Sequence, residues 1–362
     1  MRKLMYFLSL LFSGLLLTSC SEELNMTGDF KETVVVHGLL DQSDSIHFIK
    51  INRAFIGPGD ATSIAQIPDS SYFTDLVATV KEYIGSSTTP TRTWTLQDTL
   101  IDNKESGVFY APQQKVYYFH TIGQQPLNDE ATYHLDLSLK GGTIQVHGET
   151  RLVKDISSPT SSQNFQFKFV DNNGIYIPTA VTAAVGNSSV MNAKLRIAFN
   201  EYRSGVPTLK TFDWNLGEVE VEENTNQTFT ANGETFYNLI KANVTEDPLI
   251  DQRRFVSISA IFTGGSQELY NYMSVNKPSS SLAQNKPTYT NLTISGEARV
   301  IGIFSSRNTL TYTRPFYLDP GLPFVRCINT KSTQELCIGQ ITGSLLFCSQ
   351  HIADQAQSWY CD

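Results

Sequence analysis

The amino-acid sequence predicts a mainly β protein with two β-sandwich-like modules, the second carrying one or two short helices and ending in a disulfide-stapled tail. Three observations predict this class. The 362 residues are enough for about two domains. The chain contains 21 Phe and 16 Tyr, which favour strands over helices. Residues 131–139 alternate strictly between apolar and polar side chains, as a half-buried strand does.

Charge and composition exclude several classes of protein. The 27 Lys and Arg residues stand against 35 Asp and Glu residues, giving a formal net charge of −8. A nucleic-acid-binding surface needs clustered basic residues to displace counterions, so nucleic acid is not an expected partner. Hydrophobic residues make up 40% and charged residues 17% of the chain, which excludes a disordered chain and a coiled coil.

Residues 1–19 have the pattern of a lipoprotein signal peptide. Two basic residues precede an apolar run over 4–17, which is shorter than the length that a transmembrane helix needs to span a bilayer. The run ends at 17–20 with Leu-Thr-Ser-Cys, which resembles a bacterial lipobox. The resemblance implies cleavage before Cys20 and a lipid on its sulfur, with acyl chains such as palmitate. Because several acyl chains anchor a protein stably, residues 20–32 become a lipidated tether.

The three residues that directly follow the cysteine indicate the localisation of the lipoprotein. Ser21, Glu22 and Glu23 resemble the surface-export signal of Bacteroidota lipoproteins. That resemblance implies display on the outer face of the outer membrane. A solvated linker is the alternative, since Ser and Glu are common in linkers.

Residues 33–156 form the first expected module, which reads as a series of short strands. Turn-forming residues separate the apolar, β-branched runs. A long polar loop is expected over 57–73. The expected strands are 33–39, 45–55, 75–84, 107–110, 116–122, 131–139 and 143–153.

Residues 157–320 form the second expected module, opening with a serine-rich boundary at 157–162. Two segments, 234–244 and 267–275, have apolar residues at helical spacing. The expected strands are 165–169, 191–202, 218–223, 254–262 and 290–305.

Residues 321–362 hold the remaining four cysteines, Cys327, Cys337, Cys348 and Cys361. An exported chain meets an oxidising compartment, so we expect two disulfides here, with three possible pairings left open. A zinc site is the rival interpretation. The intervening gaps of nine, ten and twelve residues differ from the close pairs of zinc sites, and no metal is expected.

The sequence resembles a Bacteroidota domain-of-unknown-function outer-membrane lipoprotein family, often encoded beside TonB-dependent receptors. The resemblance is carried by the lipobox, by segments 34–38 and 289–304, and by 107–110 with 132–135. It implies an immunoglobulin-like or carboxypeptidase-regulatory-like first module. It also implies partnership with a transport or adhesion system. The loop at 57–73 and the four-cysteine tail depart from the family pattern.

Motifs for catalysis are missing from the sequence. It has no H-E-x-x-H, G-x-S-x-G or phosphate-loop pattern. Of six histidines, five lie in the first module, without the spacing of metal ligands. Trp94, Trp214 and Tyr176 are candidates for a sugar-stacking platform, although burial in a core is the more common role of an aromatic residue. The acidic run at 218–223 is expected to be a solvated strand face.

The sequence therefore predicts a surface-exposed outer-membrane lipoprotein that is not an enzyme and needs no cofactor. Its expected role is an accessory or ligand-binding partner of a TonB-dependent transport system, with a glycan or peptide as a possible ligand. The alternative is an adhesin or fimbria-associated structural subunit, because tandem β modules with an open sheet edge also build such subunits. A surface hydrolase ranks last, since fold analogy alone does not establish function.

Overall fold

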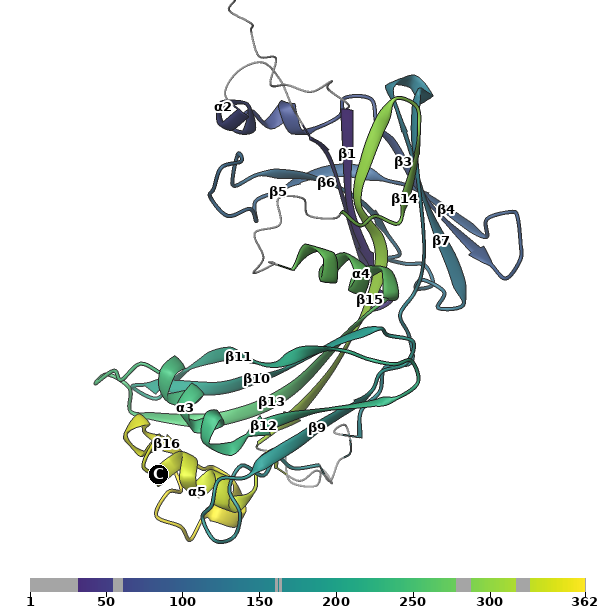
Figure 1. The fold of residues 1–362 in the computed structure, drawn as a ribbon. Coiled ribbons are helices and arrows are strands. Elements are labelled where there is room, and N and C mark those ends of the chain that lie inside the picture. Colours follow the sequence, from purple (N-terminus) through teal and green to yellow (C-terminus); the bar gives the residue numbers. More distant parts are fainter. Residues whose placement is uncertain are drawn as a thin grey trace, which may run out of the picture.

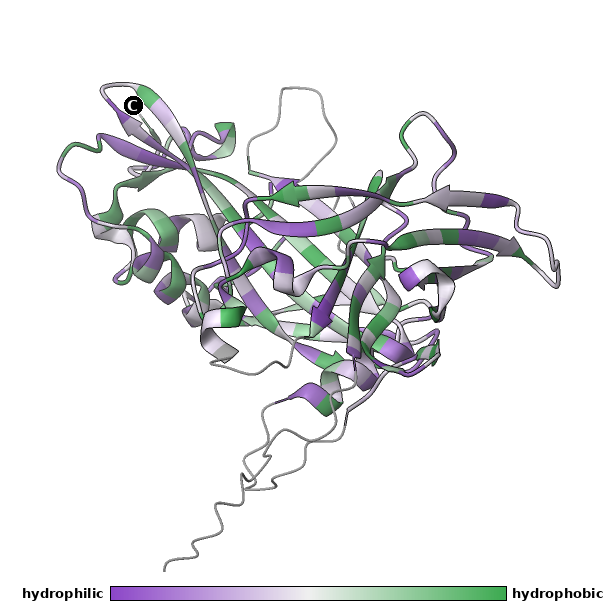
Figure 2. Cartoon of the chain, turned by 90° about the horizontal axis from the view of Figure 1, so that it is seen from above, coloured by the Kyte–Doolittle hydropathy of each residue, from purple (hydrophilic) through white to green (hydrophobic). Residues whose placement is uncertain are grey.

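The structure is a computed structural model that describes residues 32–54, 61–159, 162, 165–277, 288–316 and 326–361. Within these residues the chain is mainly β, with several sheets and few helices, as the sequence predicts. Two modules are visible in Figure 1, one above the other. Hydrophobic and hydrophilic residues alternate along many strands in Figure 2.

The first module is a sandwich of two sheets. One sheet has the order β14-β8-β7-β3-β4, and the other includes β1, β2, β6 and β5. The strands are β1 (Glu32–Leu40), β2 (Ile46–Ala54), β3 (Val77–Ile84), β4 (Arg92–Thr95), β5 (Gln97–Ile101), β6 (Gln114–His120), β7 (Ala131–Leu139), β8 (Ile144–Arg151) and β14 (Leu292–Ser295).

Strict alternation explains why these strands pack as a sandwich. In β1 and in β7 every second residue is buried. Val34 and Val36 of β1 meet Leu135 and Leu137 of β7 in one hydrophobic core. Fully burying one such side chain stabilises the fold by about 1.5–3 kcal/mol. The opposite side chains of β1 are left on the outer face of the sheet, where the candidate site lies.

One long strand, β15 (Ala298–Pro315), belongs to both modules. Its residues 298–306 pair in parallel with β1, and residues 307–315 pair antiparallel with β13 (Gln252–Gly265). A single nine-stranded sheet therefore runs through the molecule, as Figure 1 shows. The boundary expected near residue 157 follows β8, but β14 and the first half of β15, which fall within the range 157–320, pair with strands of the first module.

The second module is built on the other half of this sheet. A two-stranded ribbon and two helices accompany it. Its elements are β9 (Pro178–Ala184), β10 (Val190–Arg203), β11 (Val206–Glu220), β12 (Asn226–Asn232), α3 (Gly233–Asn243), α5 (Thr330–Ile338) and β16 (Phe347–Cys348). The helix expected over 234–244 is confirmed as α3, whose N-terminus is capped by the Asn232 side chain accepting from the Thr235 amide at 3.2 Å.

Helix α4 (Gln267–Asn276), also expected from its spacing, lies between the modules in Figure 1. The Tyr272 hydroxyl lies 2.9 Å from Nε2 of His37 on β1. On the other side, Tyr270 donates to Glu220, and Lys277 lies 3.6 Å from Glu218. The acidic run expected to be a solvated face therefore also holds α4 against the second module.

Three expected elements differ in the structure. Residues 107–110 form no strand, and the described part of the 57–73 loop contains α2 (Ala61–Ala65) and the 3-10 helix η1 (Pro68–Ser71). Residues 165–169 also form no strand. The Phe167 amide donates to the Cys327 carbonyl at 2.7 Å, and the Phe169 amide donates to Ser332 Oγ at 2.9 Å. The backbone amides of this segment therefore bond to the C-terminal segment instead of to a neighbouring strand. Local periodicity in the sequence cannot reveal such a distant partner.

No helix among the described residues is long and apolar enough to cross a membrane.

Candidate functional site

The residues singled out for anchoring lie outside the described residues. Cys20, Ser21, Glu22 and Glu23 all precede residue 32, where the described part of the chain begins. Lipidation and surface export therefore stay predictions from the sequence.

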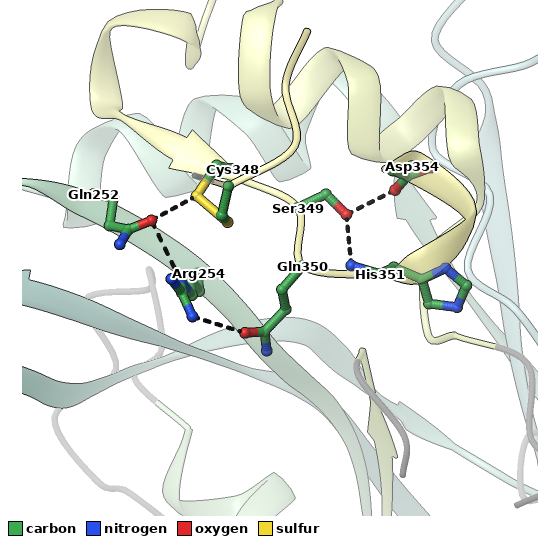
Figure 3. Close-up of a disulfide and its surroundings, with 8 residues drawn as sticks. Gln252, Arg254, Cys348, Ser349, Gln350, His351 and Asp354 are labelled. Atoms are coloured by element: carbon green, nitrogen blue, oxygen red, sulfur yellow. Dashed lines mark hydrogen bonds between the residues drawn. A yellow bond between two sulfur atoms is a disulfide. The ribbon is translucent and has the colours of Figure 1, made fainter. Parts of the chain in front are cut away.

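The four C-terminal cysteines form one disulfide, between Cys348 and Cys361, with Cα atoms 5.0 Å apart. Figure 3 shows its surroundings, where β16 runs alongside β13 and Arg254 donates to Gln350 at 3.2 Å. Cys327 and Cys337 are buried free thiols, which corrects the expectation of two disulfides. Both pack in the core of the second module as small apolar side chains.

A buried ion pair also supports this tail. Nη1 of Arg326 lies 2.5 Å from Oδ2 of Asp354, which also accepts from the Ser349 hydroxyl at 2.7 Å. Figure 3 shows the Ser349 contact and the Ser349 Oγ accepting from the His351 amide. Such a pair becomes costly if one partner is removed, because a charge is left buried alone. The tail is therefore a structural unit.

The aromatic platform considered from the sequence is not assembled. Trp94 is buried in the core of the first module, and Trp214 in that of the second. Tyr176 is half-buried and donates to Glu335 at 2.6 Å. The core role that the sequence favoured is confirmed for Trp94 and Trp214, while Tyr176 packs against the second core only in part.

Ionisable side chains gather on the outer face of the five-stranded sheet. Asp136 lies 2.9 Å from Nζ of Lys81 and 2.8 Å from Nδ1 of His147. Burial opposes ionisation of Asp136, but hydrogen bonds from His147 and Lys81 outweigh it and lower the pKa. Cross-strand pairs of opposite charge stabilise a sheet. The described residues hold no group of three or more His, Cys, Asp or Glu suited to a metal ion.

A cavity of about 550 Å³ lies on the outer face of the other sheet of the first module. Its floor is made of two cross-strand pairs from β1 and β2, Val35 with Asn52 and His37 with Lys50. These residues occupy the positions that alternation turns away from the core. In Figure 1 this is the side of the module that carries α2.

The walls of the cavity come from α2 with η1 and from the segment 104–110. Hydrogen bonds join the two walls, because the Tyr110 amide donates to the Ala65 carbonyl at 3.0 Å. Tyr72 accepts from the Lys115 amide at 2.9 Å and ties η1 to β6. Val108 and Phe109 remain 59% and 53% exposed at the rim. The cavity is therefore preformed and largely apolar, as small-molecule sites are.

Positive charge collects in this cavity. Of its sixteen lining residues, three are Lys or Arg and none is Asp or Glu. Arg53 is compensated by Glu32, 3.0 Å away. Lys50 and Lys104 have no ion-pair partner among the described residues. Burial and the charge of Lys104 lower the pKa of Lys50, while burial and the charge of Lys50 lower that of His37. The arrangement suits recognition of an anion.

Sequence reasoning missed this cavity. The alternation of side chains along β1 and β2, which is visible in the sequence, places His37 and Lys50 on the outward face of the sheet. The walls come from segments that the sequence analysis assigned to a polar loop and to a strand. Val108 and Phe109 look like strand residues, yet their exposed side chains edge a cavity instead of joining a sheet.

Comparisons with known proteins add little. No family model and no curated protein matches the chain. Among solved structures, the chain is similar to the C-terminal globular domain of an oligosaccharyltransferase from Pyrococcus abyssi. The match has 9% identity and a TM-score of 0.22, and it covers 64% of this chain and 47% of the other. A TM-score this low carries no argument about fold or function.

Proposed function

We propose that the protein is a lipid-anchored outer-membrane lipoprotein that binds a small ligand on behalf of a TonB-dependent transport system, without catalysing a reaction. The observation that carries this proposal is the preformed cavity in the module that follows the lipobox. Only eleven residues separate Cys20 from the start of β1. At about 3.4 Å per residue, the first module would lie within about 40 Å of the membrane surface.

We propose display on the cell surface because of the acidic residues that follow Cys20. The test is protease shaving of intact cells, with a periplasmic protein as the internal control. The wild-type lipoprotein should be cleaved while the periplasmic control survives. The double substitution Glu22→Ala/Glu23→Ala should protect it from shaving. The matched control, Glu222→Ala/Glu223→Ala, removes two exposed acids in the second module and should change nothing.

Anchoring and partnership are tested in the same cells. The wild type should incorporate labelled palmitate and Cys20→Ala should not. Crosslinking before detergent extraction should recover a TonB-dependent receptor with the wild type. Labelling that persists in Cys20→Ala would contradict the proposed anchor. Recovery of the lipoprotein alone across several detergents would contradict the proposed partnership.

The alternative proposal is an adhesin or fimbria-associated subunit. The observation in its favour is β11, a 15-residue strand at the edge of the nine-stranded sheet. An open edge can accept a strand from another chain. However, Pro207, Lys210 and Asp213 lie on this strand, and proline and charged residues discourage edge pairing. A ladder of oligomers on an unboiled gel would favour this alternative over the first.

A further inference from the structure

We propose that the cavity on the β1–β2 face takes an organic anion with an apolar body, such as a long-chain or aromatic carboxylate. This inference rests on the ligand-binding role proposed above and names the class of ligand. It is carried by two lysines that have no acidic partner in the described part of the chain and are set among apolar walls in a cavity of small-molecule size.

The cations are built into the floor by strand register. His37 and Lys50 are directly opposite each other on β1 and β2, and both are half-buried. The ammonium group of Lys104 reaches in from the wall, 5.3 Å from the centre of the Phe109 ring. A partly buried cation loses hydration, and the Phe109 ring beside Lys104 offsets less of that loss than a carboxylate would. A carboxylate bound between Lys50 and Lys104 would offset both that loss and their mutual repulsion.

The lowered pKa of Lys50 supports the same conclusion. Burial is the larger cause and the charge of Lys104 the smaller one. Elsewhere in this module, lysines in sheets are paired: Lys81 with Asp136 at 2.9 Å and Lys115 with Asp98 at 3.3 Å. Lys50 on β2 and Lys104 in the segment between β5 and β6 are in no ion pair among the described residues, and both line the same cavity.

The walls determine the rest of the ligand. Val35, Ala54 and Ala65 line the interior, and Val108 and Phe109 stand largely exposed at the rim. Exposed apolar side chains beside a concave site are typical of ligand-binding surfaces. A volume of about 550 Å³ lies within the range of small-molecule sites, roughly 300–1,000 Å³. The complementary ligand therefore combines one acidic group with an aliphatic or aromatic body.

Two fluorescent dyes test the charge requirement directly. The dye 8-anilinonaphthalene-1-sulfonate carries an anionic group, and N-phenyl-1-naphthylamine has the same aromatic body without it. Binding is measured on residues 20–362 with Cys20→Ser, which retains every described residue and needs no detergent. We expect Lys50→Met and Lys104→Met each to weaken binding of the anionic dye about tenfold, as loss of a charged hydrogen-bond partner does, and of the neutral dye less than about twofold.

Two further variants locate the binding and control for charge. Val35→Trp should fill the cavity and abolish binding of both dyes, while circular dichroism shows the fold intact. Lys241→Met, which removes an exposed lysine on α3, should leave both affinities unchanged. Decanoate should displace the anionic dye at lower concentration than decanol does.

Three results would overturn the inference. The first is that the lysine variants weaken the binding of both dyes equally. The second is that Val35→Trp binds both dyes as the wild type does, and the third is that the wild type binds neither dye. Because the measurement uses purified protein in solution, it is independent of the shaving experiment. A periplasm-facing lipoprotein that binds the anionic dye would refute surface display while supporting the ligand class.

Discussion

At the residue scale, His47 shows how one buried polar side chain makes stability depend on pH. Its ring is 2% exposed and stacks on Phe119, with ring centres 4.7 Å apart. Neither ring nitrogen has a hydrogen-bond partner among the described residues. Burial lowers the pKa of His47 from its ordinary value of 6.5 to about 4, and the nearby Asp41 carboxylate only partly opposes this.

The lowered pKa predicts that the protein loses stability in mild acid. As the pH falls below about 6.5, the unfolded chain binds a proton at His47 before the folded protein does. The folded state should therefore lose up to about 3 kcal/mol between pH 7 and pH 4. His47→Phe keeps the stacking and should remove this part of the loss. Urea unfolding at both pH values measures it, with the exposed His120→Phe as control. Equal acid sensitivity in His47→Phe and wild type would contradict the assignment.

At the element scale, the pairing of β15 with β1 depends on a residue without a side chain. Gly302 has φ +102°, a conformation that other residues rarely adopt. A Cβ atom at this position would lie 1.9 Å from the carbonyl oxygen of Val36 on β1. The two strands can therefore approach at this register only because residue 302 is glycine.

Gly302→Ala should weaken this strand pair and destabilise the protein by about 3 kcal/mol or more, because strain and lost hydrogen bonds add. Thermal or chemical unfolding of the purified variant measures the change. Gly107→Ala is the matched control, since a Cβ atom there would meet nothing within 4 Å. Similar stabilities for the two variants would show that β15 does not need glycine at this point.

At the scale of the whole molecule, neither module is a continuous piece of chain. The core of the first module includes Leu292 and Phe304, which come from β14 and β15. The second half of β15 pairs with β13 in the second module. Helix α4 contacts His37 in one module and Glu220 in the other. The modules therefore share backbone as well as side-chain contacts.

Residues 33–156 expressed alone should not fold into a stable monomer. This fragment lacks two strands, leaves β1 with an open edge and exposes apolar core residues. Adding a synthetic peptide of residues 289–307 should restore cooperative unfolding, and a scrambled peptide should not. Circular dichroism and size-exclusion chromatography give the readout. A folded, monomeric fragment without peptide would contradict the shared architecture.

Local patterns in the sequence predicted local elements well. Alternation identified β7, and helical spacing identified α3 and α4, because these signals depend on neighbours within a few residues. The pairing of β1 with β15 joins residues more than 250 positions apart and leaves no local trace. The same limit applies to the cavity, whose floor was indicated by outward residues but whose walls were not. It also applies to Cys327 and Cys337, whose spacing could not show that they remain unpaired.

The shared strand β15 also delays completion of the first module until late in synthesis of the chain. Domains generally fold in the order in which the ribosome synthesises them. Synthesis proceeds at about 5–20 residues per second. Strand β8 ends at Arg151, but β1 receives its last partner only when residue 306 has been made. By that rate the first module would wait roughly 10–30 seconds with an unpaired edge. During this interval the nascent chain would need a chaperone or an export factor to prevent aggregation. A prematurely terminated chain would stay recognisable to proteases, because its first module never closes.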